Sequence, residues 1–470
     1  MKKITIILLI VLLGGVQLQA QAQWSLNQCI DYALEHNIQV KQTKLQAESS
    51  QANLKQTKLS IYPNLNANAS DAFQYGRTID PYTNLYTDQN VQSFSLSVSS
   101  QVTLFQGLKK HNSIKKNNYT YLSNLQEIER VKNSISMQVA TAYLQILFDK
   151  ELLEVAKRQM EITKEQVERT KVLVEAGSLA KGNLLEIQAQ LAQEEMSHIN
   201  AQNNIRTDYL SLTQLLELDS ADGFEIEIPQ IDDPSEELIL ASVDEIYQKS
   251  TDLPRIKKQE LNVKSADFGL KIAKGGYYPR LYLNASYGTG YSSARSKYDT
   301  EPADPRPIGW VDGSMTPVYT QGFNTITLPY DYIDQLNDNR SFSFVIGISI
   351  PIFNNWKVKT DIINSKLNYE NAQLQLELTK NNLYKEIQQA HNAAVSALAK
   401  FRASKRSVEA QKESFSYTKQ KFDLGLVNSV DYNTAKNQLT KAESDMVQAK
   451  YDFVFRINIL NFYMGKPFKL

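Results

Sequence analysis

The chain has 470 residues, and its 51 lysines and arginines balance its 51 aspartates and glutamates. A net charge of zero gives no electrostatic case for binding nucleic acid. Cys29 is the only cysteine, which excludes an intrachain disulfide framework and a multi-cysteine metal site.

The first 22 residues are predicted to be a signal peptide. Two lysines precede an apolar run at residues 4–16, and the Ala-Gln-Ala sequence at 20–22 has the small residues of a cleavage site. The apolar run is too short for a helix that crosses a bilayer, which needs about 20 residues. We therefore expect an exported chain whose mature form begins near Gln23.

The rest of the sequence is a tandem duplication. Residues 40–70 align without a gap to 256–286, with a Tyr-Pro pair and an Asn-Ala-Ser triplet in matching places. Residues 93–107 align in the same way to 341–355, at an offset of 248 residues that also places Gly177 on Gly425. We therefore predict a first repeat at 23–218, a linker at 219–242 and a second repeat at 243–470.

Each repeat is predicted to contain a helix, two strands and a long helical hairpin, in that order. The first helices span about 25–61 and 243–275. The second repeat carries extra residues, rich in proline, glycine and aspartate, which predict a long surface loop at 287–340. The strands are expected at about 64–75, 91–105, 280–291 and 341–353.

The long helices are predicted at about 108–176 and 357–424. At a rise of 1.5 Å per residue, either would be about 100 Å long. Apolar residues recur every seven positions, from Val139 to Val174 and from Ile387 to Phe422. A sustained seven-residue repeat indicates helices that pack side by side along their length, as in coiled coils.

The strand candidates alternate polar and apolar residues and are flanked by aromatic residues. This pattern fits membrane β-strands, although a soluble antiparallel sheet would show the same alternation. The signal peptide favours the membrane. A membrane barrel must be closed, and four strands are too few, so several chains must share it. Two chains give eight strands and three give twelve, and the strands alone leave both open.

Several segments resemble the TolC-type outer-membrane efflux protein (outer-membrane factor) family. They are SLNQCIDYALEHNIQVK at 25–41, YPNL and YPRL before the strands, and FDLGL at 422–426 followed by Asp431. The resemblance implies a mainly α-helical protein with membrane β-strands: a homotrimer with a twelve-stranded β-barrel in the outer-membrane lipid of a Gram-negative bacterium, continued by a twelve-helix α-barrel in the periplasm.

The same resemblance implies a duct of a tripartite efflux or type I secretion system. It would pass substrates from a periplasmic adaptor protein and an inner-membrane transporter to the exterior. It implies no cofactor and no metal, and the sequence does not name the cargo, the adaptor or the pump.

The resemblance also implies roles for residues at the two hairpin turns. It places the adaptor-docking tip at Gly177, Ser178, Leu179, Ala180, Gly425, Leu426, Val427, Asn428 and Ser429. It places the periplasmic constriction, or gate, at Asp431, Phe422, Asn183, Glu186 and Thr434. Glycine suits the end of a helix, and Ser429 is expected to cap the start of the returning helix.

Three copies of Asp431 would form an acidic ring that attracts cations. The alternative is a solvated aspartate favoured by the start of a helix. The family pattern is incomplete here: Asn183 is the repeat equivalent of Asp431, and Thr434 stands where some members have a second acidic residue. Val427 stands where some members have an arginine that locks the closed tip, which argues against a charge-based lock.

Two other classes of function fit the sequence less well. An enzyme is disfavoured because the four histidines are scattered and the sequence has no HExxH, P-loop or GxSxG motif. A trimeric coiled-coil structural or adhesive surface protein would account for the heptads, but not for the duplicated strand pairs and return turns. Ion conductance would distinguish a duct from such a rod.

Overall fold

The computed structural model describes residues 23–79, 84–87, 90–234, 241–466 and 468, so the predicted signal peptide lies outside it. The chain divides into two compact units. The helical unit contains the residues up to Ala52, Asn118–Ser265 and the residues from Tyr369 onward. The sheet unit contains Asn53–Asn117 and Ala266–Asn368.

The first helix of each repeat is two helices, which corrects the expected single spans 25–61 and 243–275. In the first repeat, α2 (Leu26–His36) and α3 (Ile38–Leu59) are separated by Asn37, whose extended ψ of 129° breaks the helix. The Asn37 side chain accepts hydrogen bonds from the backbone N–H groups of Gln39 and Val40, and so caps α3.

In the second repeat, α6 (Val243–Ser250) is followed by α7 (Pro254–Lys274) and a short 3-10 turn, η1 (Gly275–Tyr277). Proline has no N–H and a fixed φ, so it ends a continuous helix but suits the first position of a new one.

Two helical hairpins follow the strands. The long helices α4 (Lys109–Glu175) and α9 (Lys357–Asp423) have 67 residues each, close to the predicted 108–176 and 357–424. They return as α5 (Lys181–Leu215) and α10 (Ser429–Tyr463), with 35 residues each. Among the described residues, no helix is long and apolar enough to cross a bilayer.

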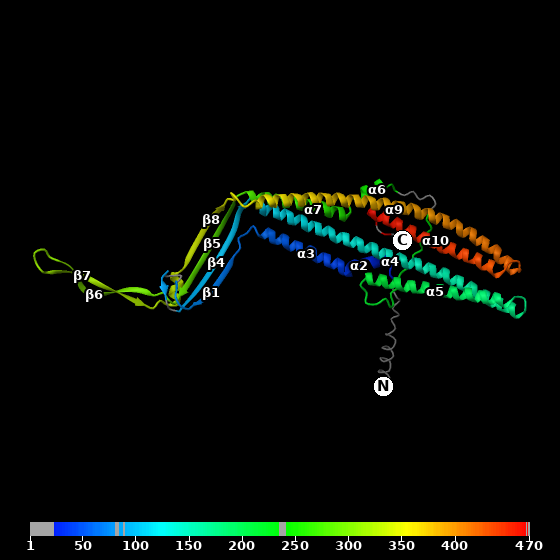
Figure 1. Cartoon of the computed structure of the whole chain (residues 1–470), viewed down its shortest axis with the longest axis horizontal. Helices are drawn as coiled ribbons and strands as arrows, with labels where there is room; N and C mark the ends of the chain where they lie inside the picture. Colours follow the sequence, from blue (N-terminus) through cyan, green and yellow to red (C-terminus); the bar gives the residue numbers. More distant parts are fainter. Residues whose placement is uncertain (1–22, 80–83, 88–89, 235–240, 467, 469–470) are drawn as a thin grey trace, which may run out of the picture. The chain divides into compact units, whose positions relative to one another are not determined.

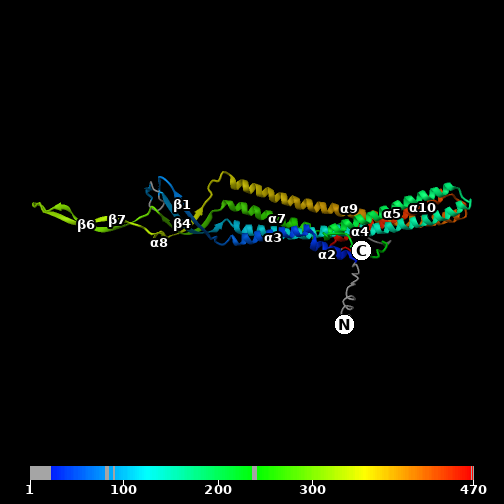
Figure 2. The same ribbon diagram turned by 90° about the horizontal axis from the view of Figure 1, so that it is seen from below.

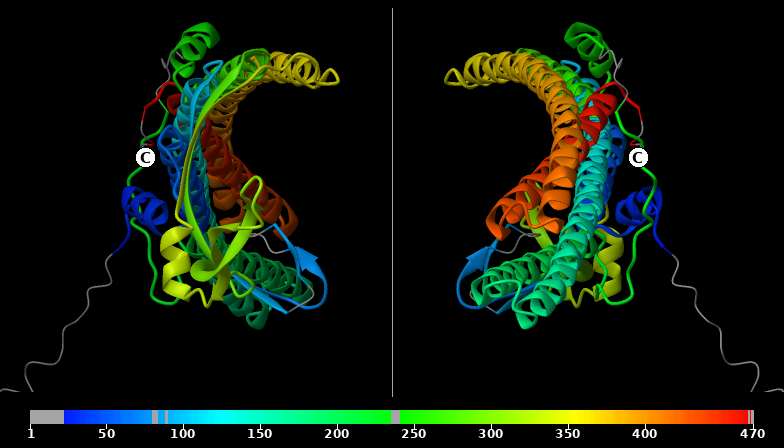
Figure 3. Two further views of the ribbon diagram at one scale, coloured as in Figure 1. Left: turned by 90° about the vertical axis from the view of Figure 1, so that its left-hand side faces the viewer. Right: turned by 90° about the vertical axis from the view of Figure 1, so that its right-hand side faces the viewer.

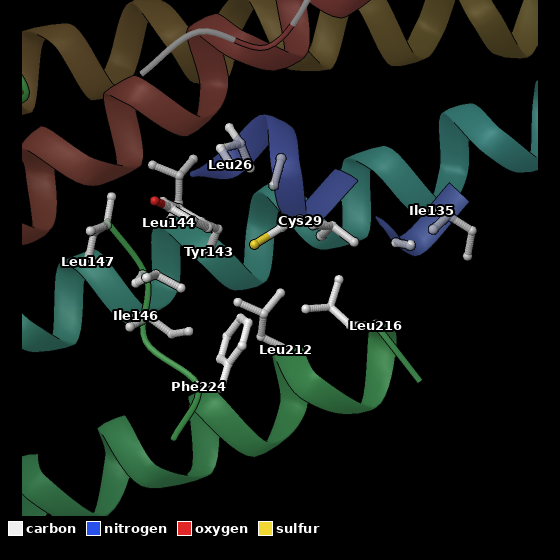
Figure 4. Packing of buried hydrophobic residues seen from close by; sticks show 14 of the residues in the cluster. Leu26, Cys29, Ile135, Tyr143, Leu144, Ile146, Leu147, Leu212, Leu216 and Phe224 are labelled. Atoms are coloured by element: carbon white, nitrogen blue, oxygen red, sulfur yellow. The ribbon is translucent and has the colours of Figure 1, made fainter. Parts of the chain in front are cut away.

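The first core of the helical unit packs α2 against α4 and α5 (Figure 4). Its members include Leu26, Cys29, Tyr143, Ile146, Leu212 and Phe224. Trp24 forms a parallel bridge with Ile226, and the Tyr143 hydroxyl donates to the Glu227 carbonyl at 2.6 Å. The start of the predicted linker is therefore fixed to the first repeat.

A second core packs α6 and α7 against α9 and α10, with Ile246, Ile256, Leu383, Ile387, Ala394 and Leu460 as its buried residues. Ile387 and Ala394 stand 248 positions after Val139 and Ile146, and all four side chains are fully buried. The duplicated heptad positions therefore support equivalent cores in the two repeats.

The sheet unit contains one antiparallel four-stranded sheet in the order β1-β4-β5-β8 (Figure 1). Its strands are β1 (Asn66–Gln74), β4 (Val91–Gln106), β5 (Arg280–Ser292) and β8 (Ser341–Ser349). Two short strands of two residues each, β2 (Thr78–Ile79) and β3 (Tyr86–Thr87), pair with each other and lie between β1 and β4 in the chain. The last strand ends before the predicted 353, because Pro351 has no N–H for the ladder.

The two faces of this sheet differ in chemistry. Residues that pair across strands lie on the same face, so Phe342 shares a face with Tyr287, and Ile346 with Leu283. One face is therefore largely apolar: Phe94, Leu96, Val98, Val102, Leu281, Leu283, Tyr287, Phe342, Phe344, Ile346 and Ile348. The other carries mainly small and polar side chains: Ser95, Ser97, Ser99, Gln101, Asn284, Ser286, Ser341 and Ser343.

The segment expected as a surface loop at 287–340 contains regular strands and a helix, which corrects its assignment as a loop. It begins inside β5 and contains the hairpin β6 (Lys297–Trp310) and β7 (Pro317–Leu328), then α8 (Tyr332–Asp338). Prolines are tolerated because the pairing of β6 with β7 shifts register twice near them. Gln335 of α8 is buried and exchanges hydrogen bonds with the backbone of Ser292 at 3.0 and 3.1 Å.

Candidate functional site

The two hairpin turns lie at the same end of the helical unit (Figures 1 and 2). Both close with the same motif. Gly425 has a φ of +73° and donates to the Phe422 carbonyl, while Leu426 donates to the Lys421 carbonyl. Gly177, with a φ of +76°, and Ser178 repeat this pattern. The positive φ values confirm the predicted glycine at the end of each long helix, where glycine has no Cβ to strain this conformation.

The start of α10 corrects one expectation. Asn428, not Ser429, is the N-cap, and its side chain accepts from the Asp431 backbone N–H at 2.9 Å. Ser429 is buried at the first helical position, and its hydroxyl donates to the Glu186 carboxylate at 2.7 Å. Asparagine is as good a cap as serine, so the serine hydroxyl is free to join α10 to α5.

The predicted constriction residues are distributed over three helices. Asp431 and Thr434 are exposed near the start of α10, and Glu186 is exposed on α5 with its carboxylate bound to Ser429. Asn183 is half-buried in the first turn of α5, where its backbone N–H donates to the Ala180 carbonyl. Among these residues, Glu186 of α5 is therefore held against the start of α10 by its hydrogen bond with Ser429.

Phe422 has an aromatic partner that the sequence did not reveal. Its ring centroid lies 4.7 Å from that of Tyr432, and Phe415 lies 5.4 Å from the same ring. Tyr432 is buried, and burial, assisted by the charge of Asp423, raises its pKa to about 12. Phe422 therefore packs within its own chain between α9 and α10. In the sequence, the seven-residue interval between Tyr432 and Leu439 is the pattern that indicates a buried position for Tyr432.

The second missed residue is Arg169 of α4, which forms an ion pair with Asp423, the last residue of α9. It joins the two hairpins near the turns, where Val427 supplies no charge. Both side chains are more than a third exposed, so the pair contributes little to stability. The duplication does not point to Arg169, because its repeat equivalent is Tyr417.

The predicted docking tip is partly apolar and exposed. Leu426 has 69% of its surface exposed, and Ala180 is also exposed, whereas Leu179 and Val427 are half-buried. Leu424 and Val430, which lie outside the predicted set of tip residues, add exposed apolar surface beside them. Exposed apolar groups that lie close together commonly mark a contact with another molecule. Figure 3 (right) views the helical unit from this end.

The described residues hold no group of three or more histidine, cysteine, aspartate or glutamate side chains that would bind a metal ion. The arrangement at the turns is therefore one of exposed carboxylates, capped helix ends and apolar side chains.

A family model for "outer membrane efflux protein" matches residues 29–217 and 251–466. The chain belongs to this family. The two matched segments fall on the two repeats and leave out residues 218–250, which include α6.

Curated relatives and solved structures agree with this family. The outer membrane protein TolC of Escherichia coli is 20% identical over 98% of this chain and 85% of its own length. TolC of Vibrio cholerae is 19% identical over 69% of this chain, which spans 66% of that relative. The crystal structure of the Campylobacter jejuni CmeC outer membrane channel superimposes with a TM-score of 0.76 at 17% identity, covering 94% of this chain and 86% of that one. The protomer thus has the fold of an outer-membrane channel.

Proposed function

We propose that three copies of this chain form a duct in the outer membrane of a Gram-negative bacterium. The duct passes substrates from a periplasmic adaptor and an inner-membrane transporter to the exterior, and it catalyses no reaction. The proposal rests on the four-stranded sheet, which has one apolar face, one polar face and two open edges, in a chain that belongs to the efflux family.

The edges require other copies. β1 and β8 are the outer strands of the sheet, and the described residues leave the far side of each without a partner strand. An open edge is not tolerated in hydrocarbon, because the unpaired N–H and C=O groups have no water to bind. Two chains would close eight strands, which side chains fill, whereas three close twelve and leave a lumen.

We assign one face of the sheet to the lipid and the other to the lumen. Phe342 and Ile346 on the apolar face have 71% and 62% of their surface exposed in the single chain. A lone soluble protein would cover such a face, whereas a membrane barrel turns it toward lipid. The serine and amide face then lines the lumen, where hydrogen bonds such as Ser286 to Ser343, at 2.7 Å, lie.

The helical unit supplies the periplasmic part of the duct. The two glycine turns form its tip, where exposed Leu426 and its neighbours contact the adaptor. Asp431 lies at the constriction, so a trimer places three carboxylates around one axis. The β6–β7 hairpin and α8 lie in the segment that connects β5 to β8, and long strand-connecting segments of membrane barrels face the exterior.

Planar-bilayer recording of the purified full-length protein tests the proposal. We expect discrete conductance steps from the heat-resistant oligomer. An oligomer that is folded and stable but never conducts would instead identify a structural or adhesive rod. Co-purification of an adaptor and a pump would name the partners.

A further inference from the structure

Lys436 is a fully buried cation in the second turn of α10. Its side chain is 1% exposed, and it lies on the inner face of the helix with Tyr432 and Leu439. Lysine is almost never fully buried unless it is paired, and the constriction residues proposed above do not include it. Its position therefore requires an explanation.

The ammonium group of Lys436 joins α10 to both helices of the other hairpin. It donates to the Gln159 carbonyl of α4 at 2.9 Å, to the Thr163 hydroxyl of α4, and to the Glu194 carboxylate of α5 at 2.9 Å. An ammonium group has three N–H donors, so all of them have partners here.

Glu194 is fixed in turn by its own neighbours. It accepts from the Thr163 hydroxyl at 2.5 Å and from the Gln190 amide at 2.8 Å, and its side chain is only 12% exposed. The Gln190 amide also donates to Asn437, the residue after Lys436, at 3.2 Å. Burial lowers the pKa of Lys436, an effect that the hydrogen bond with Glu194 opposes.

A buried ion pair is a poor source of stability but a good source of specificity. Apolar side chains of similar volume usually stabilise a helix interface as well or better. An apolar seam, however, tolerates sliding and rotation of one helix on another, whereas a single buried polar residue fixes the register. The repeat equivalent of Lys436 is Gln188, which is exposed. The feature therefore belongs to α10 and not to the duplicated architecture.

We propose that Lys436 is a positioning residue that fixes the axial register and rotation of α10 against α4 and α5. Asp431 and Thr434 lie on the exposed side of the same helical turns. The register set by Lys436 therefore determines where their side chains project. The effect on the constriction rests on the proposed function, whereas the role of Lys436 in fixing the register of α10 does not.

The test replaces the pair by apolar residues, in the variant Lys436→Met/Glu194→Met. Register is measured by disulfide formation within one chain. Glu186→Cys/Ser429→Cys marks the observed contact, and Glu186→Cys/Asn433→Cys marks the position one turn further along. The native Cys29 is fully buried, and burial raises its pKa to about 12, so it stays a thiol and does not interfere.

With Lys436 and Glu194 present, we expect the 186–429 pair to form at least about ten times faster than the 186–433 pair, a ratio that corresponds to about 1.4 kcal/mol. In Lys436→Met/Glu194→Met the ratio falls to within about twofold, while the oligomer keeps its resistance to heat. A tenfold preference that survives in the folded double variant would overturn the proposal.

A milder variant covers the possibility that the double variant does not fold. Thr163→Val removes one partner of the ammonium group at nearly constant volume, so it should lower the ratio by a smaller factor. An unchanged ratio in Thr163→Val also contradicts the proposal. Because these disulfides form within one chain, the ratio is independent of conductance. Unaltered ion selectivity in Asp431→Asn would refute the constriction and leave the register result standing.

Discussion

The hydroxyl of Ser429 donates a hydrogen bond to the carboxylate of Glu186, 2.7 Å away, and joins the start of α10 to the start of α5. The two carboxylates proposed for the constriction therefore differ. The Glu186 carboxylate accepts this hydrogen bond. Asp431 is exposed, and its hydrogen bond with Asn428 is made by its backbone N–H and not by its carboxylate.

Ion selectivity should reflect this difference. Asp431→Asn should lower the preference for cations in planar-bilayer recordings and weaken block by trivalent cations. Charges 8 Å apart in water interact by about 0.5 kcal/mol, so the permeability ratio should fall roughly twofold or more per such interaction. Glu186→Gln, the matched control, should change it less. Equal selectivity in Asp431→Asn and the unmodified protein would return Asp431 to the role of a helix-start carboxylate.

The tip should be sensitive to the backbone of Gly425. No atom lies within 4 Å of a Cβ added there, so Gly425→Val meets no clash and acts through its positive φ alone. A side chain in this region costs roughly 1–2 kcal/mol, whereas asparagine tolerates it. Transport in cells should therefore fall with Gly425→Val and persist with Gly425→Asn, with both proteins inserted. Full transport by Gly425→Val would make the tip assignment wrong.

The faces of the sheet can be distinguished with two neighbouring residues of β8. Ile346→Arg places a charge on the apolar face, which costs about 2–4 kcal/mol in the middle of a bilayer. Val345→Arg places the same charge on the face proposed to line the lumen. The amount of heat-resistant oligomer in outer-membrane fractions should fall with Ile346→Arg only. Equal losses for both variants would contradict the assignment of lipid and lumen.

A carboxyl pair between α4 and α5 predicts a pH dependence of stability. Burial, together with a hydrogen bond and the charge of Asp149, raises the pKa of Asp208 to about 7. Its Oδ2 is buried without a hydrogen-bond partner among the described residues. The pKa of Asp208 is higher in the folded state than in the unfolded state, where it is near 3.9. The group therefore stabilises the folded protein fully below about pH 3.9, and this stabilisation is lost as the pH rises through about 7.

Asp208→Asn should therefore raise the midpoint of thermal unfolding at pH 8 and leave it nearly unchanged at pH 4. Glu195→Gln, at an exposed position of the same helix, is the control. The same shift at both pH values would show that Asp208 is not protonated in the fold.

The sequence predicted what repetition and periodicity encode. The heptads from Val139 and Ile387 indicated the long helices, and the glycine turns indicated their ends. The sequence did not reveal features that depend on contacts between side chains from distant segments of the chain. Asn37 breaks a helix by capping the next one, and Tyr432 contacts Phe422 across the hairpin. Lys436 resembles a surface lysine in the sequence, but it is buried between its own helix, α10, and the helices α4 and α5.

The ordered hairpin at β6 and β7 was missed for a different reason. Its prolines and glycines are typical of loops, yet Pro302 and Pro307 are accommodated in a two-stranded ribbon. Composition alone does not distinguish a proline that breaks a strand from one that sits at an irregular edge.

Native mass spectrometry of the protein extracted in detergent tests the shared barrel most directly. If three sheets close through β1 and β8, the main species should have three times the mass of the mature chain. A stable monomer or dimer as the sole species would contradict the shared barrel and, with it, the duct.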